Sequence, residues 1–203
     1  MTFFIDFDRT LFDTYRSYQY LSNKLTVVPD VKELFDEVML GAEKFNLNNP
    51  RRAEVSRELE RLFTEGLITL DPGEYAQYVY PDAQKFLDIH GEHSVIVTAN
   101  RACPSYQKAK LEASGVFAIV QAVSNIPLAG GATKGSEVAA LIKKYDGPYF
   151  FIDDHDSQLL AVKEECPDVA VYEMRRDGNP GIGSVPTVTS FDELEQLIKN
   201  NGS

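Results

Sequence analysis

The stretch FFIDFDRTLFDT, residues 3–14, leads from an apolar segment directly into two carboxylates. Residues 2–6 form a short and almost continuous apolar run, which is typical of a strand covered on both faces of a sheet. Asp6 and Asp8 stand two positions apart, and Arg9 follows at once. Carboxylates at the end of a buried strand are costly unless a cation, a hydrogen bond or a reaction uses them. The stretch therefore indicates a solvated turn, a metal site, or a nucleophile beside its acid partner.

Four further apolar segments repeat this pattern and alternate with helical ones. Strands are expected at 93–99, 117–124, 148–153 and 168–174. Helices are expected at 82–91, 103–115, 133–147, 156–166 and 190–200. The alternation favours an α/β fold, a Rossmann-like parallel sheet with helices on both faces. Right-handed crossovers would place the loops after the strands at one edge of the sheet, where ligands bind.

The region 15–79 interrupts the alternation, because it holds helical patterns and no convincing strand. Two amphipathic helices are expected in it, at 29–45, with Asp30 as N-cap, and at 50–66. We therefore expect a small helical cap inserted above the Asp6 edge of the sheet. The expected division is a Rossmann-like core of residues 1–14 and 80–203, and a cap of residues 15–79.

Composition and charge limit the possible partners. The chain has 203 residues, 43% hydrophobic and 25% charged, as in an ordinary globular protein. No apolar stretch approaches the ~20 residues that span a bilayer, and Asp6 and Asp8 interrupt the N-terminal run, so we expect a cytoplasmic protein without a signal peptide. A net charge of −11 argues against nucleic acid or an anionic membrane as partner, but not against a small phosphorylated substrate. Cys103 and Cys166 are expected to be reduced thiols.

Three more segments place polar side chains at the ends of strands or helices. Thr98 closes the apolar run of VIVTAN, and Asp153 and Asp154 close that of FFIDDHDSQ. Lys134 stands in the first turn of a helix, an unfavourable place for a cation unless it has a function. Together with DFDRT, and in their order along the chain (DFDRT, VIVTAN, Lys134, FFIDDHDSQ), these segments resemble the four motifs of the haloacid dehalogenase-like hydrolases, whose commonest members are magnesium-dependent phosphatases. The resemblance covers nearly the whole chain outside 15–79, which itself resembles the family's helical cap of the first type.

The resemblance implies a phosphatase that hydrolyses a small phosphate monoester. Asp6 would attack phosphorus and form an aspartyl-phosphate. Asp8 would protonate the leaving oxygen and later deprotonate the hydrolytic water. The phosphoryl oxygens would be bound by the Thr98 hydroxyl, by backbone N–H groups from Ala99 onward, and by the Lys134 ammonium.

The resemblance also implies a Mg²⁺ ion, which would neutralise the charge that otherwise repels a carboxylate nucleophile. Its ligands would be Asp6, Asp154 and the backbone carbonyl of Asp8, with Asp153 as a ligand or as a neighbour of the ligands. Four residues after Asp154 the family usually has Asp or Asn, whereas this chain has Gln158. Gln158 could hold a metal-bound water or contact Lys134; alternatively, Asp156 takes that part.

Several side chains near the motifs stay open between a site role and an ordinary structural one. His155 is better explained as a loop histidine than as a base. Arg9 either touches the substrate or faces the junction with the cap, and Thr10 is expected to brace the turn. The same choice stays open for Asn100, Arg101, Tyr15, Arg16, Tyr18, Arg175 and Arg176.

Two other functions stay open as alternatives. One is phosphoryl transfer to a second hydroxyl, as in the family's phosphomutases, and the other is a non-catalytic phosphate-binding regulatory protein. Dehalogenation is disfavoured, because the family's dehalogenases lack the carboxylate that Asp8 supplies here. Neither the phosphate ester nor the oligomeric state is indicated by any motif.

Overall fold

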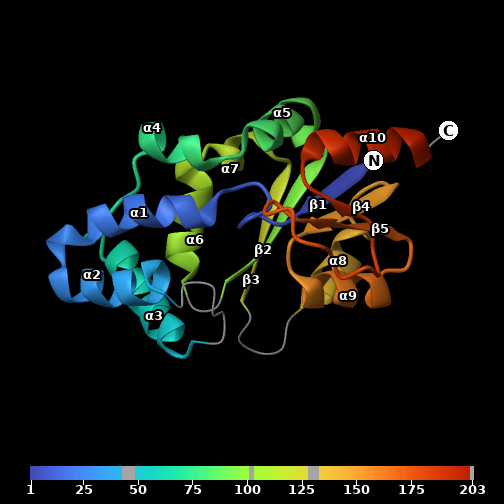
Figure 1. The fold of residues 1–203 in the computed structure, drawn as a ribbon. Helices are drawn as coiled ribbons and strands as arrows, with labels where there is room; N and C mark the ends of the chain where they lie inside the picture. The colour runs from blue at the N-terminus through green and yellow to red at the C-terminus, as the bar shows by residue number, and fades with distance from the viewer. Residues whose placement is uncertain (43–48, 101–102, 128–132, 202–203) are drawn as a thin grey trace.

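The centre of the molecule is a six-stranded parallel sheet with the strand order β3-β2-β1-β4-β5-β6 (Figure 1). We describe it from a computed structural model that covers residues 1–42, 49–100, 103–127 and 133–201. The strands are β1 (Thr2–Ile5), β2 (Ser94–Asn100), β3 (Ala122–Pro127), β4 (Tyr149–Asp153), β5 (Val169–Met174) and β6 (Thr187–Val188). The predicted α/β, Rossmann-like fold is confirmed.

Helices cover both faces of this sheet. Neighbouring residues of a strand point to opposite faces, and the strands are mostly apolar, so both faces carry apolar side chains that must be buried. Phe3 of β1 packs against Phe86 of α5 (Pro81–His90), with ring centroids 5.0 Å apart, and α10 (Phe191–Asn201) lies on the same face. Phe4 points to the other face, where α8 (Lys134–Leu141) and α9 (Asp156–Glu165) close a second apolar core. Each face of the sheet thus has its own core.

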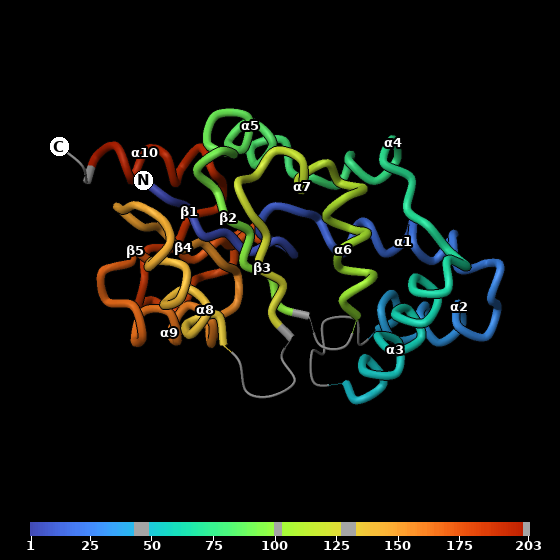
Figure 2. Tube along the Cα trace, turned by 180° about the vertical axis from the view of Figure 1, so that it is seen from behind, coloured from blue at the N-terminus to red at the C-terminus, as the bar shows by residue number. Residues whose placement is uncertain are grey.

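The N-terminal helices lie beside the sheet rather than on either face, as both views show (Figures 1 and 2). They contact the sheet domain through α6 (Pro104–Ala113), which α7 (Val116–Ile119) follows. The helices are α1 (Thr14–Lys24), α2 (Pro29–Phe35), the π-helical turn η2 (Asp36–Leu40), α3 (Arg51–Thr64) and α4 (Pro72–Tyr75). Short 3₁₀ turns are η1 (Leu25–Val27), η3 (Ala76–Tyr78) and η4 (Gly91–His93). That 15–79 acts as a separate cap stays a prediction.

Some predicted elements differ from the observed ones for identifiable reasons. The strand expected at 117–124 is wrong in its first half, because Gly115 (φ 79°) starts a helical turn, α7, and β3 begins only at Ala122. A short apolar run of this kind cannot be assigned to strand or helix by periodicity alone. The segment after β5, expected to be irregular, ends in the two-residue edge strand β6.

Two helix boundaries also differ. Asp30 is not an N-cap: α2 begins at Pro29, since proline suits the first position of a helix. The helix expected at 133–147 ends at Leu141, and residues 43–45 of the helix expected at 29–45 lie outside the described residues. In the described part of the chain, no helix is long and apolar enough to cross a membrane.

The topology itself selects one place for a ligand. From β1 the chain builds β2 and β3 on one side, and it then returns to place β4 on the other side of β1. In open α/β sheets, ligands bind at the carboxyl ends of the strands where the strand order reverses in this way. The backbone amide of Asp6 still bonds the Ile152 carbonyl at 2.8 Å, so the ends of β1 and β4 are held side by side.

Candidate active site

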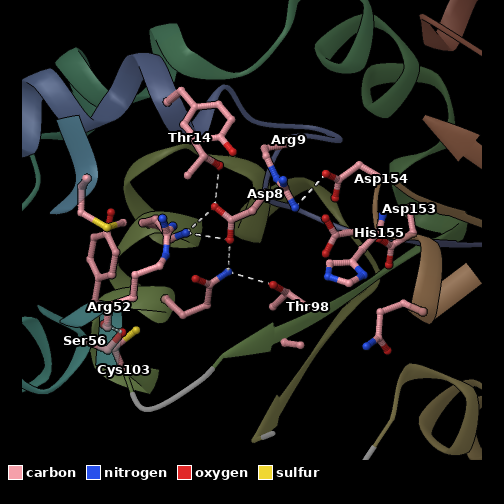
Figure 3. Close-up of a pocket in the computed structure, with 18 of the residues that line it drawn as sticks. Asp8, Arg9, Thr14, Arg52, Ser56, Thr98, Cys103, Asp153, Asp154 and His155 are labelled. Carbon is pink, nitrogen blue, oxygen red and sulfur yellow. Dashed lines mark hydrogen bonds and ion pairs between the residues drawn. The ribbon is translucent and has the colours of Figure 1, made fainter. Parts of the chain in front are cut away.

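A cavity of about 350 Å³ opens at this switch point, between the sheet edge and the N-terminal helices (Figure 3). The sheet supplies one wall and the helices α1, α3 and α6, with η2, supply the other. All of the side chains predicted for the site from the sequence line this cavity: Asp6, Asp8, Thr98, Ala99, Lys134, Asp153 and Asp154.

Three carboxylates meet at the bottom of the cavity. One oxygen from each of Asp6, Asp153 and Asp154 lies within 4.8 Å of the others. Burial raises the pKa of Asp6 to about 7 and that of Asp154 to about 8, against the opposing pull of Lys134 and Arg9 respectively. A buried carboxylate cluster whose charge is this unfavourable gains from a cation, and carboxylate oxygens are the ligands that Mg²⁺ prefers. The donor set therefore fits a magnesium ion.

Lys134 joins two of these carboxylates. It is the first residue of α8, and its ammonium donates to Asp6 and, at 2.7 Å, to Asp153. Burial opposes the charged form of Lys134, but the two carboxylates outweigh it and raise its pKa. The helix start is stabilised separately by a capping box of Thr133 and Ser136. Lys134 therefore stays charged beside the proposed nucleophile, at the helix end where a cation is otherwise unfavourable.

Each carboxylate oxygen of Asp153 accepts a hydrogen bond from another residue. Lys134 bonds Oδ2, and the backbone amide of His155 bonds Oδ1 at 2.8 Å. Asp153 therefore orients Lys134 and the following loop. The His155 ring faces Ser157, with Nδ1 at 3.1 Å from the hydroxyl, and burial lowers its pKa. This favours the interpretation of His155 as a loop histidine.

Asp8 points toward α6 and away from the carboxylate cluster (Figure 3). Its oxygens accept bonds from the Lys110 ammonium at 2.5 and 2.7 Å, from Thr14 at 2.7 Å and from Gln107 at 3.0 Å. Burial would raise the pKa of Asp8, but the Lys110 charge and these hydrogen bonds outweigh it and hold the pKa below its ordinary value. Asp8 is thus held as an ion, in one orientation.

Thr98 is linked to Asp8 through one side chain. Gln107 donates to the Thr98 hydroxyl at 2.8 Å and to Asp8 at 3.0 Å. Thr98 lies two residues before the end of β2, where its Cα is level with that of Asn125 in β3. The hydroxyl of Thr98 therefore stands in a fixed place between the sheet edge and α6.

Arg9 pairs with a member of the carboxylate cluster. Its guanidinium Nη2 lies 2.8 Å from Oδ2 of Asp154. Burial opposes its charge, but Asp154 outweighs burial and raises the pKa of Arg9. In the structure Arg9 thus pairs with a predicted metal ligand, and it also interacts with Tyr15 of α1. Contact with the substrate and a place at the junction with the cap both stay predictions.

The two candidates for the missing motif carboxylate differ in their environment. The Gln158 amide oxygen accepts the backbone amide of Lys134 at 3.0 Å, so the expected contact with Lys134 exists through its backbone. Asp156 does not line the cavity, and pairs with Arg175 at 2.5 Å. Arg175 also pairs with the buried Glu173 at 2.5 Å.

Of the remaining candidates, Tyr15 and Tyr18 line the cavity and Arg16 does not. Arg176 bonds the Thr10 carbonyl at 2.8 Å and Asp82 at 2.7 Å, which gives it a structural role. The Thr10 hydroxyl is buried without a hydrogen-bond partner among the described residues, so that Thr10 braces the turn stays a prediction. Arg101 and the side chain of Asn100 lie outside the described part. Neither Cys103 nor Cys166 forms a disulfide within the described part of the chain.

Sequence reasoning missed most of the cavity wall that the helices supply opposite the sheet, which we call the facing wall. Gln107 and Lys110 come from α6, and both are almost fully buried. The sequence did contain a signal. Gln107 and Lys110 lie on the same face of α6 as Tyr106 and Leu111, and polar residues on a face that is expected to be apolar indicate a buried polar contact. The other lining residues that were not predicted are Thr14, Met39, Arg52, Val55, Ser56, Leu59, Cys103, Tyr106 and Ser157.

Known structures share this architecture. A protein of Burkholderia xenovorans, named as a haloacid dehalogenase-like hydrolase, superposes with a TM-score of 0.63 at 21% identity, covering 98% of this chain and 96% of that one. The chain has the haloacid dehalogenase-like fold. No family model matches its sequence, and no curated protein matches it either.

Two further structures with the haloacid dehalogenase-like fold match over nearly their whole length. A Bacillus subtilis protein, described as a hydrolase of this superfamily bound to magnesium, has a TM-score of 0.61 at 16% identity and 97% coverage of both chains. A Thermotoga maritima protein named as a β-phosphoglucomutase has a TM-score of 0.58 at 16% identity, covering 98% of this chain and 99% of that one. At these identities the matches establish the fold, and activity is argued from the site.

Proposed function

We propose that the chain is a magnesium-dependent phosphatase that hydrolyses a small phosphate monoester through an aspartyl-phosphate on Asp6. The observation that carries the proposal is the meeting of Asp6, Lys134, Asp154 and Thr98 in one cavity at the switch point. A carboxylate nucleophile, a fixed cation, a cation site and a hydroxyl donor are the parts that phosphoryl transfer requires. The shared fold, which includes known hydrolases, supports the proposal.

In the first step an oxygen of Asp6 forms a bond to phosphorus, and the bond from phosphorus to the ester oxygen breaks. Lys134 favours the ionised form of Asp6 against the effect of burial, and it faces the negative charge of the phosphoryl group. The Thr98 hydroxyl donates to a phosphoryl oxygen. A Mg²⁺ ion held by Asp6, Asp154 and the Asp8 carbonyl would neutralise phosphoryl charge.

In the second step water attacks the aspartyl-phosphate, and the bond between phosphorus and Asp6 breaks. Asp8 accepts a proton from that water, for which its ionised state is suited. The leaving oxygen of the first step receives its proton through Asp8 as well. Asp8 is ionised without substrate, so it would take this proton from solvent as the substrate binds, and the proton that it accepts from the attacking water in the second step replaces it. Lys110 and Gln107 keep the carboxylate in one position for both transfers.

The test is a phosphate-release assay on a panel of sugar phosphates, nucleotides and small phosphorylated acids, with Mg²⁺ or with a chelator. We expect Mg²⁺-dependent release, and on the order of 10³-fold loss or more in Asp6→Asn. Asp88→Asn, an exposed carboxylate on α5, is the matched control and should behave as wild type. Transfer to a second hydroxyl would favour the phosphomutase alternative. No turnover by the wild type on any ester would contradict the proposal and favour a phosphate-binding protein.

A further inference from the structure

Arg9 is held in a backbone conformation that favours glycine. Its φ of 66° is the one positive value at a non-glycine position among the described residues. The turn is fixed by its own hydrogen bonds, from the Arg9 amide to Phe12 at 2.8 Å and from the Leu11 amide to Phe7 at 3.0 Å. A glycine would adopt this φ without strain, whereas a residue with a side chain is disfavoured there. The presence of arginine is therefore explained by its side chain rather than by the turn.

The side chain extends across the cavity to Asp154 (Figure 3). The guanidinium Nη2 lies 2.8 Å from Oδ2 of Asp154, and the two side chains are 28% and 12% exposed. A pair this far removed from water is stronger than an ordinary surface pair, and removal of one partner leaves the other uncompensated. Arg9 is therefore a specific partner of Asp154.

The charges in the cluster show what this pairing does. Three carboxylates are paired with two cations: Lys134 forms ion pairs with Asp6 and Asp153, and Arg9 forms one with Asp154. With all groups ionised the cluster carries −3 + 2 = −1. Without Arg9 it carries −2, which a single divalent cation neutralises completely. The guanidinium therefore supplies the positive charge that a metal ion would bring to Asp154.

We propose that Arg9 is a built-in counter-ion, and that a divalent metal ion binds this chain by displacing the Arg9 guanidinium from Asp154. The proposal rests on the proposed function only in taking the carboxylate cluster as a Mg²⁺ site. It makes metal affinity a property of Arg9 as well as of the ligands. It also explains how the acidic cluster is stabilised before a metal ion arrives.

The experiment compares the wild type with Arg9→Gly and Arg9→Lys. Binding of Mg²⁺ is measured by titration calorimetry without substrate, and thermal unfolding is followed with Mg²⁺ and with a chelator. Arg9→Gly should bind Mg²⁺ on the order of tenfold more tightly or better, because a like charge beside the ion is removed. Mg²⁺ should also raise the melting temperature of Arg9→Gly more than that of the wild type. Arg9→Lys keeps the charge and should stay close to wild type.

The matched control is Arg51→Ala, which removes the same charge from the surface of α3, where Arg51 pairs with Glu37. It should leave Mg²⁺ affinity unchanged. Equal affinity of wild type and Arg9→Gly, or no Mg²⁺ binding by either, would overturn the proposal. Phosphate release is measured on the same samples. If the wild type releases phosphate but Arg9→Gly binds Mg²⁺ no more tightly than the wild type, the Arg9 proposal is overturned and the proposed function is not. Tighter Mg²⁺ binding without turnover on any ester leaves the Arg9 proposal standing and overturns the proposed function.

Discussion

At the scale of single residues, the site separates its two motif carboxylates by giving each its own lysine. Lys134 forms ion pairs with both Asp6 and Asp153, whereas Asp8 forms an ion pair with Lys110. Both lysines are almost fully buried, so each pairing acts in a medium that screens charge poorly. Lys110 also lies over the ring of Tyr106, at 5.1 Å from its centroid. The position of Asp8 is therefore set by a residue from the facing wall.

Lys110→Met tests this dependence. The change leaves Asp8 buried without its counter-ion, so we expect the free energy of unfolding to fall by about 3 kcal/mol. Under the proposed function, kcat should fall on the order of 10²-fold, because Asp8 loses the orientation needed for proton transfer. Lys108→Met, which removes an exposed lysine from the same helix, is the control. Chemical denaturation and steady-state kinetics give both values. A variant with wild-type kcat would show that Lys110 does not position Asp8.

At the scale of elements, the N-terminal helices are joined to the sheet domain by a capping interaction between helices. Glu60 of α3 accepts the backbone amide of Ser105 at 2.8 Å, at the start of α6, and the Ser105 hydroxyl at 2.8 Å. The first amides of a helix have no partner within it, and a carboxylate there also meets the positive end of the helix dipole. The helix that carries Gln107 and Lys110 is therefore stabilised by a carboxylate of α3.

Glu60→Ala should remove this cap and lower the free energy of unfolding by about 1 kcal/mol. Hydrogen exchange should accelerate at the first amides of α6, since they lose their acceptor. Glu58→Ala removes a half-exposed carboxylate that, among the described residues, pairs with Arg61 on the same helix, and should cost less than about 0.5 kcal/mol. Equal costs for the two variants would mean that Glu60 acts as an ordinary surface charge.

Elements were predictable where local pattern and tertiary packing agree. β1, β2, β4 and β5 are covered on both faces, and their apolar runs predict them within one residue at each end. The motif residues were predictable because four segments resemble the motifs of a known family, and three of these segments follow parallel strands, whose ends meet at one edge. The partner of Arg9 and the role of Lys110 were not, because each pairing joins residues far apart in the chain, at 145 and 102 positions. No local pattern encodes such a contact.

At the scale of the whole molecule, the carboxylate cluster makes stability depend on pH and on metal. Burial raises the pKa of Asp6 to about 7 and that of Asp154 to about 8, from an ordinary value of 3.8. At a pH between the ordinary pKa and these raised values, Asp6 and Asp154 hold protons in the folded chain that they have released in the unfolded chain. Stability falls with pH wherever the folded state binds more protons, so the metal-free protein should weaken as pH rises toward 8.

This prediction is best measured by urea unfolding between about pH 6.5 and pH 8.5, above the ordinary pKa of histidine. With a chelator present, the free energy of unfolding should fall by roughly 1 kcal/mol per pH unit for each proton retained. Saturating Mg²⁺ should reduce the slope, because the ion binds the ionised carboxylates and stabilises the folded state most at high pH. Asp154→Asn should reduce the metal-free slope and weaken the Mg²⁺ effect together, since one carboxylate is responsible for both. A metal-free stability that is flat or rises over this range would show that Asp6 and Asp154 are already ionised, with Lys134 and Arg9 fully offsetting their burial.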